Sequence, residues 1–99
     1  MKKITATVIA ERTLTCAEDA QREVVVRLAK PELNRGGANY ECAYRIVGLG
    51  NITRFAAGLD SMQALQLAFA MVGAELAHIE QTTGFHLRFC DGDTGFPRP

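Results

Sequence analysis

The sequence predicts one α+β domain, in which an antiparallel four-strand meander is followed by one long helix and a short fifth strand (ββββαβ). Apolar and polar residues alternate through the first half, apolar residues recur every three or four positions over residues 62–79, and alternation returns over residues 85–90. A helix and a sheet each need their apolar face covered, so we expect a two-layer sandwich. The chain length suits one hydrophobic core, so residues 1–99 are predicted to form a single domain.

The first two predicted strands cover residues 4–14 and 23–30, and the polar stretch AEDAQ (17–21) is predicted to be the turn between them. The first strand is rich in Thr, Ile and Val, residues that fit a pleated, half-buried surface. Three residues share the apolar face of the second strand: Val24, Val26 and Leu28. Both segments therefore have the pattern of strands with one buried face.

The third predicted strand, YECAYRIV (40–47), follows a break at Pro31 and NRGGAN (34–39). Four residues share the side expected to face the core: Tyr40, Cys42, Tyr44 and Ile46. The glycines of GLGN (48–51) predict a tight connection, since glycine adopts positive φ without steric cost. ITRFAAG (52–58) is then the fourth strand of the meander.

The helix is predicted to begin at DSMQ, where Asp60 can cap the first free amides and Gln63 can reach back as in a capping box. Gly84 is the expected stop signal. Six apolar residues fall on one predicted stripe: Met62, Leu65, Phe69, Val72, Leu76 and Ile79. This stripe is expected to seat the helix on the sheet.

The fifth predicted strand, Phe85–Cys90, alternates apolar residues with His86 and Arg88. Beside the fourth strand it would form a right-handed crossover, and beside the first strand it would close the other edge of the sheet. The sequence pattern does not decide between these two positions.

The charge balance gives no support to a nucleic-acid partner. Eleven Lys and Arg residues balance eleven Asp and Glu residues, so no surplus of positive charge would attract a polyanion. Acidic residues lie between the basic residues along the chain. Those basic residues are Lys2, Lys3, Arg27, Lys30, Arg35, Arg45 and Arg54.

Cysteine use and hydropathy favour a cytoplasmic protein without a membrane partner. Cys16, Cys42 and Cys90 form no C-x-x-C pair, which suits a reducing compartment where each would be a small buried hydrophobe. The start MKKITATVIAERT lacks the apolar core of a signal peptide. The longest apolar region, residues 65–77, is expected to be too short to span a bilayer.

Five segments occur here in an order that resembles a family of small bacterial proteins catalogued only as a domain of unknown function. The most specific of them is the G-x-D-S-x-Q-A-L run at the helix start. The segments are ERTLT (11–15), KPE (30–32), YECAYRIVGLG (40–50), AAGLDSMQALQLAFAMVGAEL (56–76) and GFP (95–97). The resemblance implies a compact α+β domain in the bacterial cytoplasm, and it implies no activity, substrate or catalytic residue.

The closing stretch CDGDTGFPRP (90–99) contains oxygen ligands that suit a hard cation at Asp91, Asp93 and Thr94. The later acids of a calcium loop are missing, so we predict instead a turn that directs Phe96 back onto the core. No metal or cofactor site is predicted.

Other chemical signals are sparse. GLG (48–50) lacks the third glycine and the helix of a dinucleotide site, and NRGG (34–37) with Arg35 fits a surface loop better than an anion-binding nest. His86 is expected to face solvent, and His78 lies late on the helix, where positive charge suits the dipole. No nucleophile, base and orienting group can be assembled by spacing, which favours a protein without catalytic activity.

The side of the helix away from the stripe is unusually neutral. Between Asp60 and Gln81 the acidic residues are Glu75 and Glu80, and no Lys or Arg occurs. A helix whose back faces water normally carries charges there. Gly73 and the alanines would allow close approach of a partner, and Met adapts to varied surfaces. The predicted interface residues are Gln63, Leu67, Ala70, Met71 and Ala74.

Two functions from different classes follow. The first is a non-catalytic interaction domain that self-associates or binds another protein through the helix back or through an edge strand. The second is a small-molecule-binding or catalytic domain that uses polar residues of the exposed sheet face. Those residues would be Tyr40, Tyr44, Arg45 and Arg54, although Tyr40 and Tyr44 share the parity of core residues.

Overall fold

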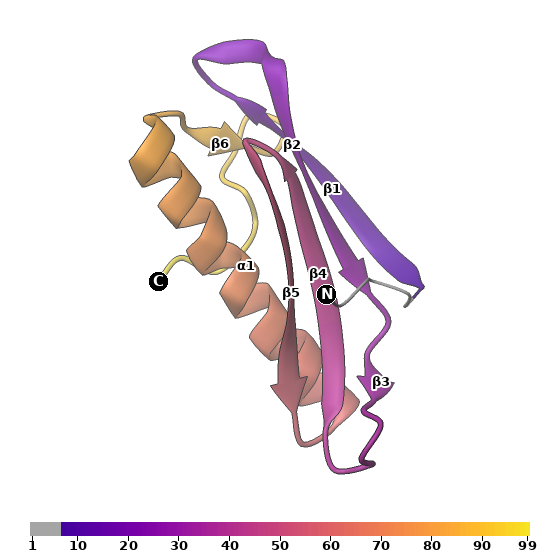
Figure 1. Ribbon diagram of the computed structural model, residues 1–99. Coiled ribbons are helices and arrows are strands. Elements are labelled where there is room, and N and C mark those ends of the chain that lie inside the picture. Colours follow the sequence, from indigo (N-terminus) through magenta and orange to yellow (C-terminus); the bar gives the residue numbers. More distant parts are fainter. Residues whose placement is uncertain (1–6) are drawn as a thin grey trace.

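The computed structural model describes residues 7–99, and residues 4–6 of the first predicted strand lie outside them. The described part has six strands and one helix, and α1 lies along one face of the sheet (Figure 1). In chain order the elements are β1 (Val8–Cys16), β2 (Asp19–Ala29), β3 (Glu32–Leu33), β4 (Tyr40–Gly48), β5 (Gly50–Gly58), α1 (Ser61–Thr83) and β6 (Leu87–Arg88). The prediction of an α+β domain with one C-terminal helix is confirmed.

The sheet is antiparallel in every strand pair of the described residues. β1 pairs with β2 and β6, β2 pairs with β4, and β5 pairs along the other side of β4. Of the two positions considered for the last strand, the structure has the one beside the first strand. β5 and β6 therefore lie at opposite ends of the sheet.

β3 extends β2 after a shift in register. Leu28 lies opposite Tyr44, and unbroken pairing would bring Pro31 opposite Glu41, but Glu32 occupies that position. Proline has no amide hydrogen to donate, so pairing resumes one residue later. The sequence pattern does not predict β3, because two residues are too few for alternation to be recognised.

The connection between β4 and β5 needs glycine for a steric reason. Gly48 has φ of 143°, and a Cβ atom there would lie 2.1 Å from the carbonyl oxygen of Glu23. Gly48 pairs with Gly50 across the turn, so the hairpin predicted at residues 48–51 is confirmed.

The ends of α1 are those predicted. The Asp60 side chain accepts a hydrogen bond of 2.7 Å from the Gln63 backbone N–H. The Gln63 side chain reaches back, although it accepts from Leu59 rather than from the cap residue itself. Gly84 adopts the left-handed conformation with φ of 78°, and its N–H donates to the Glu80 carbonyl.

The predicted stripe of α1 is only partly correct. Val72, Leu76 and Ile79 are buried as expected, but Met62 and Phe69 are 63% and 37% exposed. The stripe instead includes Ala64 and Ala68, both completely buried. Small side chains occupy these places because the helix lies close to the strands: a Cβ atom on Gly58 would be 2.4 Å from the Ala64 nitrogen.

The closing stretch folds back onto the domain as predicted. A turn joins Phe89 to Gly92, Thr94 is buried, and Phe96 is 7% exposed in the core cluster. The Arg12 guanidinium lies 4.0 Å from the centre of the Phe89 ring and donates to the Thr94 carbonyl at 3.0 Å. We call residues 91–99 the tail.

Candidate interaction surface

The predicted interface residues form two adjacent rows on α1. Residues four apart on a helix are neighbours on one face, so Gln63, Leu67 and Met71 lie in one row, which continues to Glu75. Ala70 and Ala74 form the next row outward. Leu67 is 42% exposed, and Gln63, Ala70 and Ala74 are also exposed. Met71 differs, because it is half-buried and packs partly against the core.

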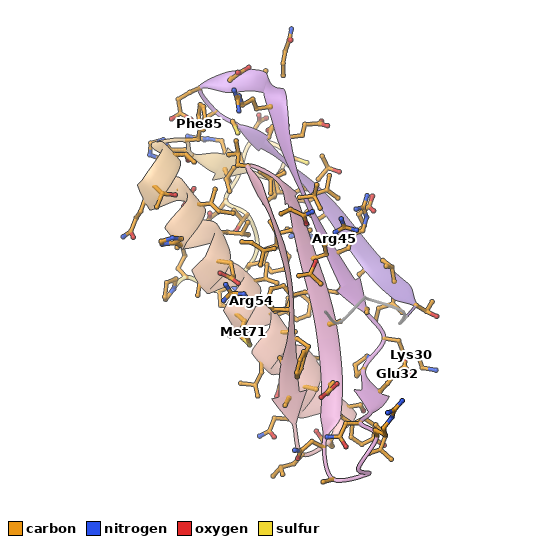
Figure 2. All side chains as sticks on the ribbon, in the orientation of Figure 1. Lys30, Glu32, Arg45, Arg54, Met71 and Phe85 are labelled. Atoms are coloured by element: carbon orange, nitrogen blue, oxygen red, sulfur yellow. The ribbon has the colours of Figure 1, made fainter. Side chains whose placement is uncertain are left out.

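The row that ends at Glu75 faces the side of α1 toward β5. Glu75 Oε2 lies 3.4 Å from the Nε atom of Arg54 on β5. Figure 2 labels Met71 just below Arg54, where α1 passes β5. The helix surface that carries Leu67 therefore adjoins the outermost strand of the sheet.

A polar group anchors this side of α1. Tyr44 is completely buried, and its hydroxyl donates to Glu75 Oε2 at 3.1 Å. Burial, together with the charge of Glu75, raises the pKa of Tyr44 to about 12. The hydroxyl thus stays protonated and acts as a donor to a carboxylate. The sequence does not predict this role of Glu75, because Tyr44 and Glu75 are 31 residues apart in the chain and no pattern links them.

The opposite flank of α1 is occupied by the tail. The Phe69 and Phe96 rings are 5.6 Å apart between centroids, and a Cβ atom on Gly73 would lie 1.8 Å from the Pro97 carbonyl oxygen. Gly73 is buried, so the sequence interpretation of this residue was wrong. Its lack of a side chain allows close approach of the protein's own tail rather than of a partner.

The acidic groups of α1 all have partners within the domain. Glu75 pairs with Arg54, and Glu80 pairs with Arg98 and accepts from the Leu87 N–H at 2.8 Å. The exposed rows between Gln63 and Ala74 thus present amide, alkyl and thioether groups to the outside. This surface has neither a formal charge of its own nor a neighbouring element of the described chain over it.

The residues of the alternative function do not gather at one place. Tyr44 lies in the core, and Arg54 is opposite it on β5, so both point to the helix side of the sheet. Tyr40 is half-buried on that same side. Arg45 points to the opposite face, where its Nε donates to Asn51 at 3.3 Å. The exposed sheet face therefore holds only Arg45 of the four.

A hollow of about 280 Å³ lies beside the tail. Its charged groups largely neutralise one another, since Arg98 pairs with both Asp93 and Glu80. This pairing with Arg98 holds the pKa of Asp93 below its ordinary value. In residues 7–99 no group of three His, Cys, Asp or Glu side chains could hold a metal ion. Of the other candidate cation ligands, Asp91 is exposed and Thr94 is buried.

The cysteines and His86, which were the candidate nucleophiles and base, do not form a catalytic group. Cys16 and Cys42 are buried, and burial raises the pKa of each thiol, which disfavours the reactive thiolate. Cys90 is exposed, contrary to the expectation that all three cysteines are buried. His86 faces solvent as expected and binds the Glu18 carboxylate. This contact lowers the pKa of Glu18 to about 2.

The basic residues do not line up on one surface in the described part of the chain. Arg27 pairs with Glu11 at 2.7 Å on the open sheet face, whereas Arg54 lies on the helix side. Arg35 lies in the exposed loop after β3. Lys2 and Lys3 lie outside the described residues.

By length and composition, α1 could cross a membrane. It has 23 residues and is largely apolar, and 33% of its most apolar stretch is buried in the domain. The sequence argument that residues 65–77 are too short does not apply to the whole helix. Core helices of soluble domains meet the same criterion, and α1 packs its buried side on β4 and β5.

A family model matches residues 10–98 of the chain, and its description is Domain of unknown function (DUF6968). No curated protein and no solved structure matches the chain.

Proposed function

Because the chain belongs to this family, whose description assigns no activity, we propose from its geometry that it is a non-catalytic module that binds another protein chain through the outer surface of α1. The observation that carries the proposal is the neutral surface of Gln63, Leu67, Ala70 and Ala74, where no residue is charged. An exposed helix face without charge gains less from water than a charged one, so covering it costs little polar desolvation.

A small-molecule site is less well supported. The residues that would form it lie on two faces of the sheet, and the hollow beside the tail is lined largely by ion-paired groups. A thermal-shift screen over nucleotides, metal ions and common metabolites tests this alternative. A ligand at about a hundred times its dissociation constant would add about 2.7 kcal/mol to the free energy of unfolding.

The proposed setting is the bacterial cytoplasm. The free thiols support it, since Cys16, Cys42 and Cys90 form no disulfide. The equal numbers of acidic and basic residues support a protein partner rather than a nucleic acid.

Replacement of Leu67 by Glu tests the proposal. Leu67 is exposed, so L67E is expected to preserve the fold while it weakens protein binding at least about tenfold, because a buried unpaired carboxylate would be costly. Binding is measured as self-association by light scattering and as retention of a partner from extracts of the native host. M71E is unsuitable, since Met71 packs on the core.

L33E is the matched control, because Leu33 is 53% exposed on β3, away from α1. It introduces the same charge and removes the same side chain. If L67E and L33E both leave every interaction of the wild-type protein unchanged, the outer surface of α1 is not a binding surface.

A further inference from the structure

We propose that two copies of this chain associate about a twofold axis by antiparallel pairing of β5 with β5, which also brings the Leu67 sides of the two α1 helices together. This inference rests on the proposed function, to which it adds the partner and the geometry. Two features on the same side of the domain support it: the outer edge of β5 and the neutral rows of α1.

The outer edge of β5 is open in the described part of the chain. β5 pairs with β4 and with no other described strand. Its nine residues pair with β4 without a bulge, from Gly58 opposite Tyr40 to Gly50 opposite Gly48. An open edge leaves alternate N–H and C=O groups without strand partners, which is the template that another strand uses.

β5 carries few of the features that usually keep an edge strand from pairing. Natural edge strands are often short or bulged, or carry Lys or Pro. β5 has neither Lys nor Pro, and its one charged residue, Arg54, is paired with Glu75. Ile52 and Thr53 are β-branched and favour the extended conformation. The edge is therefore suited to pairing with another strand.

The position of α1 above β4 and β5 favours a second copy of the chain as the partner. α1 contacts the sheet mainly through β4 and β5, so its axis lies above the last two strands at this edge. Strands in a sheet are spaced about 4.8 Å apart, and a twofold axis beside β5 would therefore place the two helices about 10 Å apart. Packed helices have axes about 8–10 Å apart. Leu67 and Met71 would fill the space between the two helices, and Ala70 and Ala74 add little bulk in the next row outward.

A free extended peptide would satisfy only part of this surface. It would pair with the β5 edge but would leave Leu67 and the alanines of α1 uncovered. A second copy related by a twofold axis would place its own β5 edge against this β5 edge. It would also place its own Leu67 row against the Leu67 row of this helix. Zero net charge adds little repulsion between copies.

The charge of Arg54 limits the possible registers of the β5–β5 pair. In an antiparallel pair, two residues directly opposite each other point to the same face of the sheet. A twofold axis normal to the sheet must therefore pass between a residue of β5 and the same residue of the second copy. An axis at Arg54 would set two guanidinium groups against each other. An axis at Thr53 instead places Arg54 opposite Ile52 and Phe55 opposite Asn51. Of the registers without this contact we choose the axis at Thr53, because it pairs residues 50–56 with their copies and keeps the β-branched Ile52 and Thr53 at its centre.

The test introduces charge at Thr53, which is exposed on the open face of the sheet and is away from the core. T53K and T53E are each expected to weaken the dimer by roughly tenfold or more, because like charges would face each other across the axis. An equimolar mixture should restore it, since the lysine of one variant lies opposite the glutamate of the other. Sedimentation equilibrium gives the dissociation constants, and native mass spectrometry identifies the mixed dimer.

T13K and T13E are the matched controls. Thr13 is an exposed threonine of the same sheet face, but it lies on β1, where it pairs with Val25. Both controls should dimerise like the wild-type protein. Circular dichroism confirms that all four variants are folded.

Three results would overturn the inference: a wild-type monomer up to millimolar concentration, a dimer that T53K and T53E leave intact, or failure of the mixture to restore association. If T53K and T53E have no effect while L67E abolishes binding, the module binds through α1 alone and only the β5 pairing is wrong. If L67E also has no effect, the proposed function fails as well.

Discussion

Tyr44 is the residue at which the sheet, the helix and the proposed interface meet. Its hydroxyl is buried and donates to Glu75, which in turn pairs with Arg54 on the edge strand. A hydrogen bond to a charged acceptor contributes about 1.5–3 kcal/mol, and Y44F removes it without removing the ring. We expect Y44F to lower the free energy of unfolding by about 1–2 kcal/mol in urea titrations, since Glu75 keeps Arg54 as a partner.

Y40F is the control for this substitution, because Tyr40 is half-buried, packs against the core and does not contact Glu75. Its free energy of unfolding should stay within about 0.5 kcal/mol of the wild-type value. Equal losses for the two variants would show that the Tyr44–Glu75 bond adds nothing specific to stability.

The same residue predicts how stability depends on alkaline pH. Burial and the Glu75 charge raise the pKa of Tyr44 from 10 to about 12, so between these values the native state keeps a proton that the unfolded chain has released. The contribution is complete below pH 10 and is lost as pH rises through about 12. Wild-type protein should therefore lose roughly 2–3 kcal/mol more than Y44F across this window. Parallel curves of unfolding free energy against pH would contradict this assignment.

At the scale of elements, Gly73 gives the sharpest prediction for α1. Replacement of glycine by alanine inside an exposed helix usually stabilises it by about 1 kcal/mol. Here the new Cβ atom would lie 1.8 Å from the Pro97 carbonyl oxygen, so G73A must displace the tail or move the helix. We expect a net loss of about 1–3 kcal/mol in the free energy of unfolding, with changed NMR shifts for Phe96.

A74G is the neighbouring control in the monomer, where Ala74 is exposed and its replacement reports helix propensity, about 1 kcal/mol. A G73A protein more stable than wild type, with an unchanged tail, would show that Pro97 does not pack on α1.

The elements that sequence predicted well are those whose signals are local. The alternation of Val24, Val26 and Leu28 identified a buried strand face, and Asp60 and Gly84 identified both ends of α1. The stripe of α1 was misjudged at Met62 and Phe69 because apolar character does not reveal how closely a helix approaches its sheet. Alanines fill the narrow part of that contact, and the tail covers Phe69.

The sequence predicts which residues form the candidate surface on α1, but it does not predict that this surface lies beside β5. The absence of Lys and Arg from α1 is visible in the sequence, and it singled out Leu67 and its neighbours. That these rows adjoin the open edge of β5 follows from the Glu75–Arg54 pair, which joins residues 21 apart in the chain. No periodic pattern encodes such a contact, because it depends on how the helix crosses the sheet.

At the scale of the whole molecule, the tail packs against both the first described strand and the helix. It contacts Arg12 on β1 and Phe69 on α1, and Arg98 ties it to Glu80. Its anchor is Phe96, the last aromatic residue, which is 7% exposed. A segment with this much burial is part of the core rather than a loose end, so its loss should destabilise every element at once.

F96A is therefore expected to lower the free energy of unfolding by about 3–5 kcal/mol, a large share of the total for a domain of this size. The melting temperature should fall by at least about 12 °C in calorimetry, in a single transition. F89A is the control, because Phe89 is 39% exposed and its main contact is Arg12. An exposed cation–π contact contributes about 0.5–1 kcal/mol, so F89A should cost far less than F96A. Should F96A instead melt in two steps, with α1 and the sheet intact after the first, the tail would be an appendage whose packing is independent of the domain.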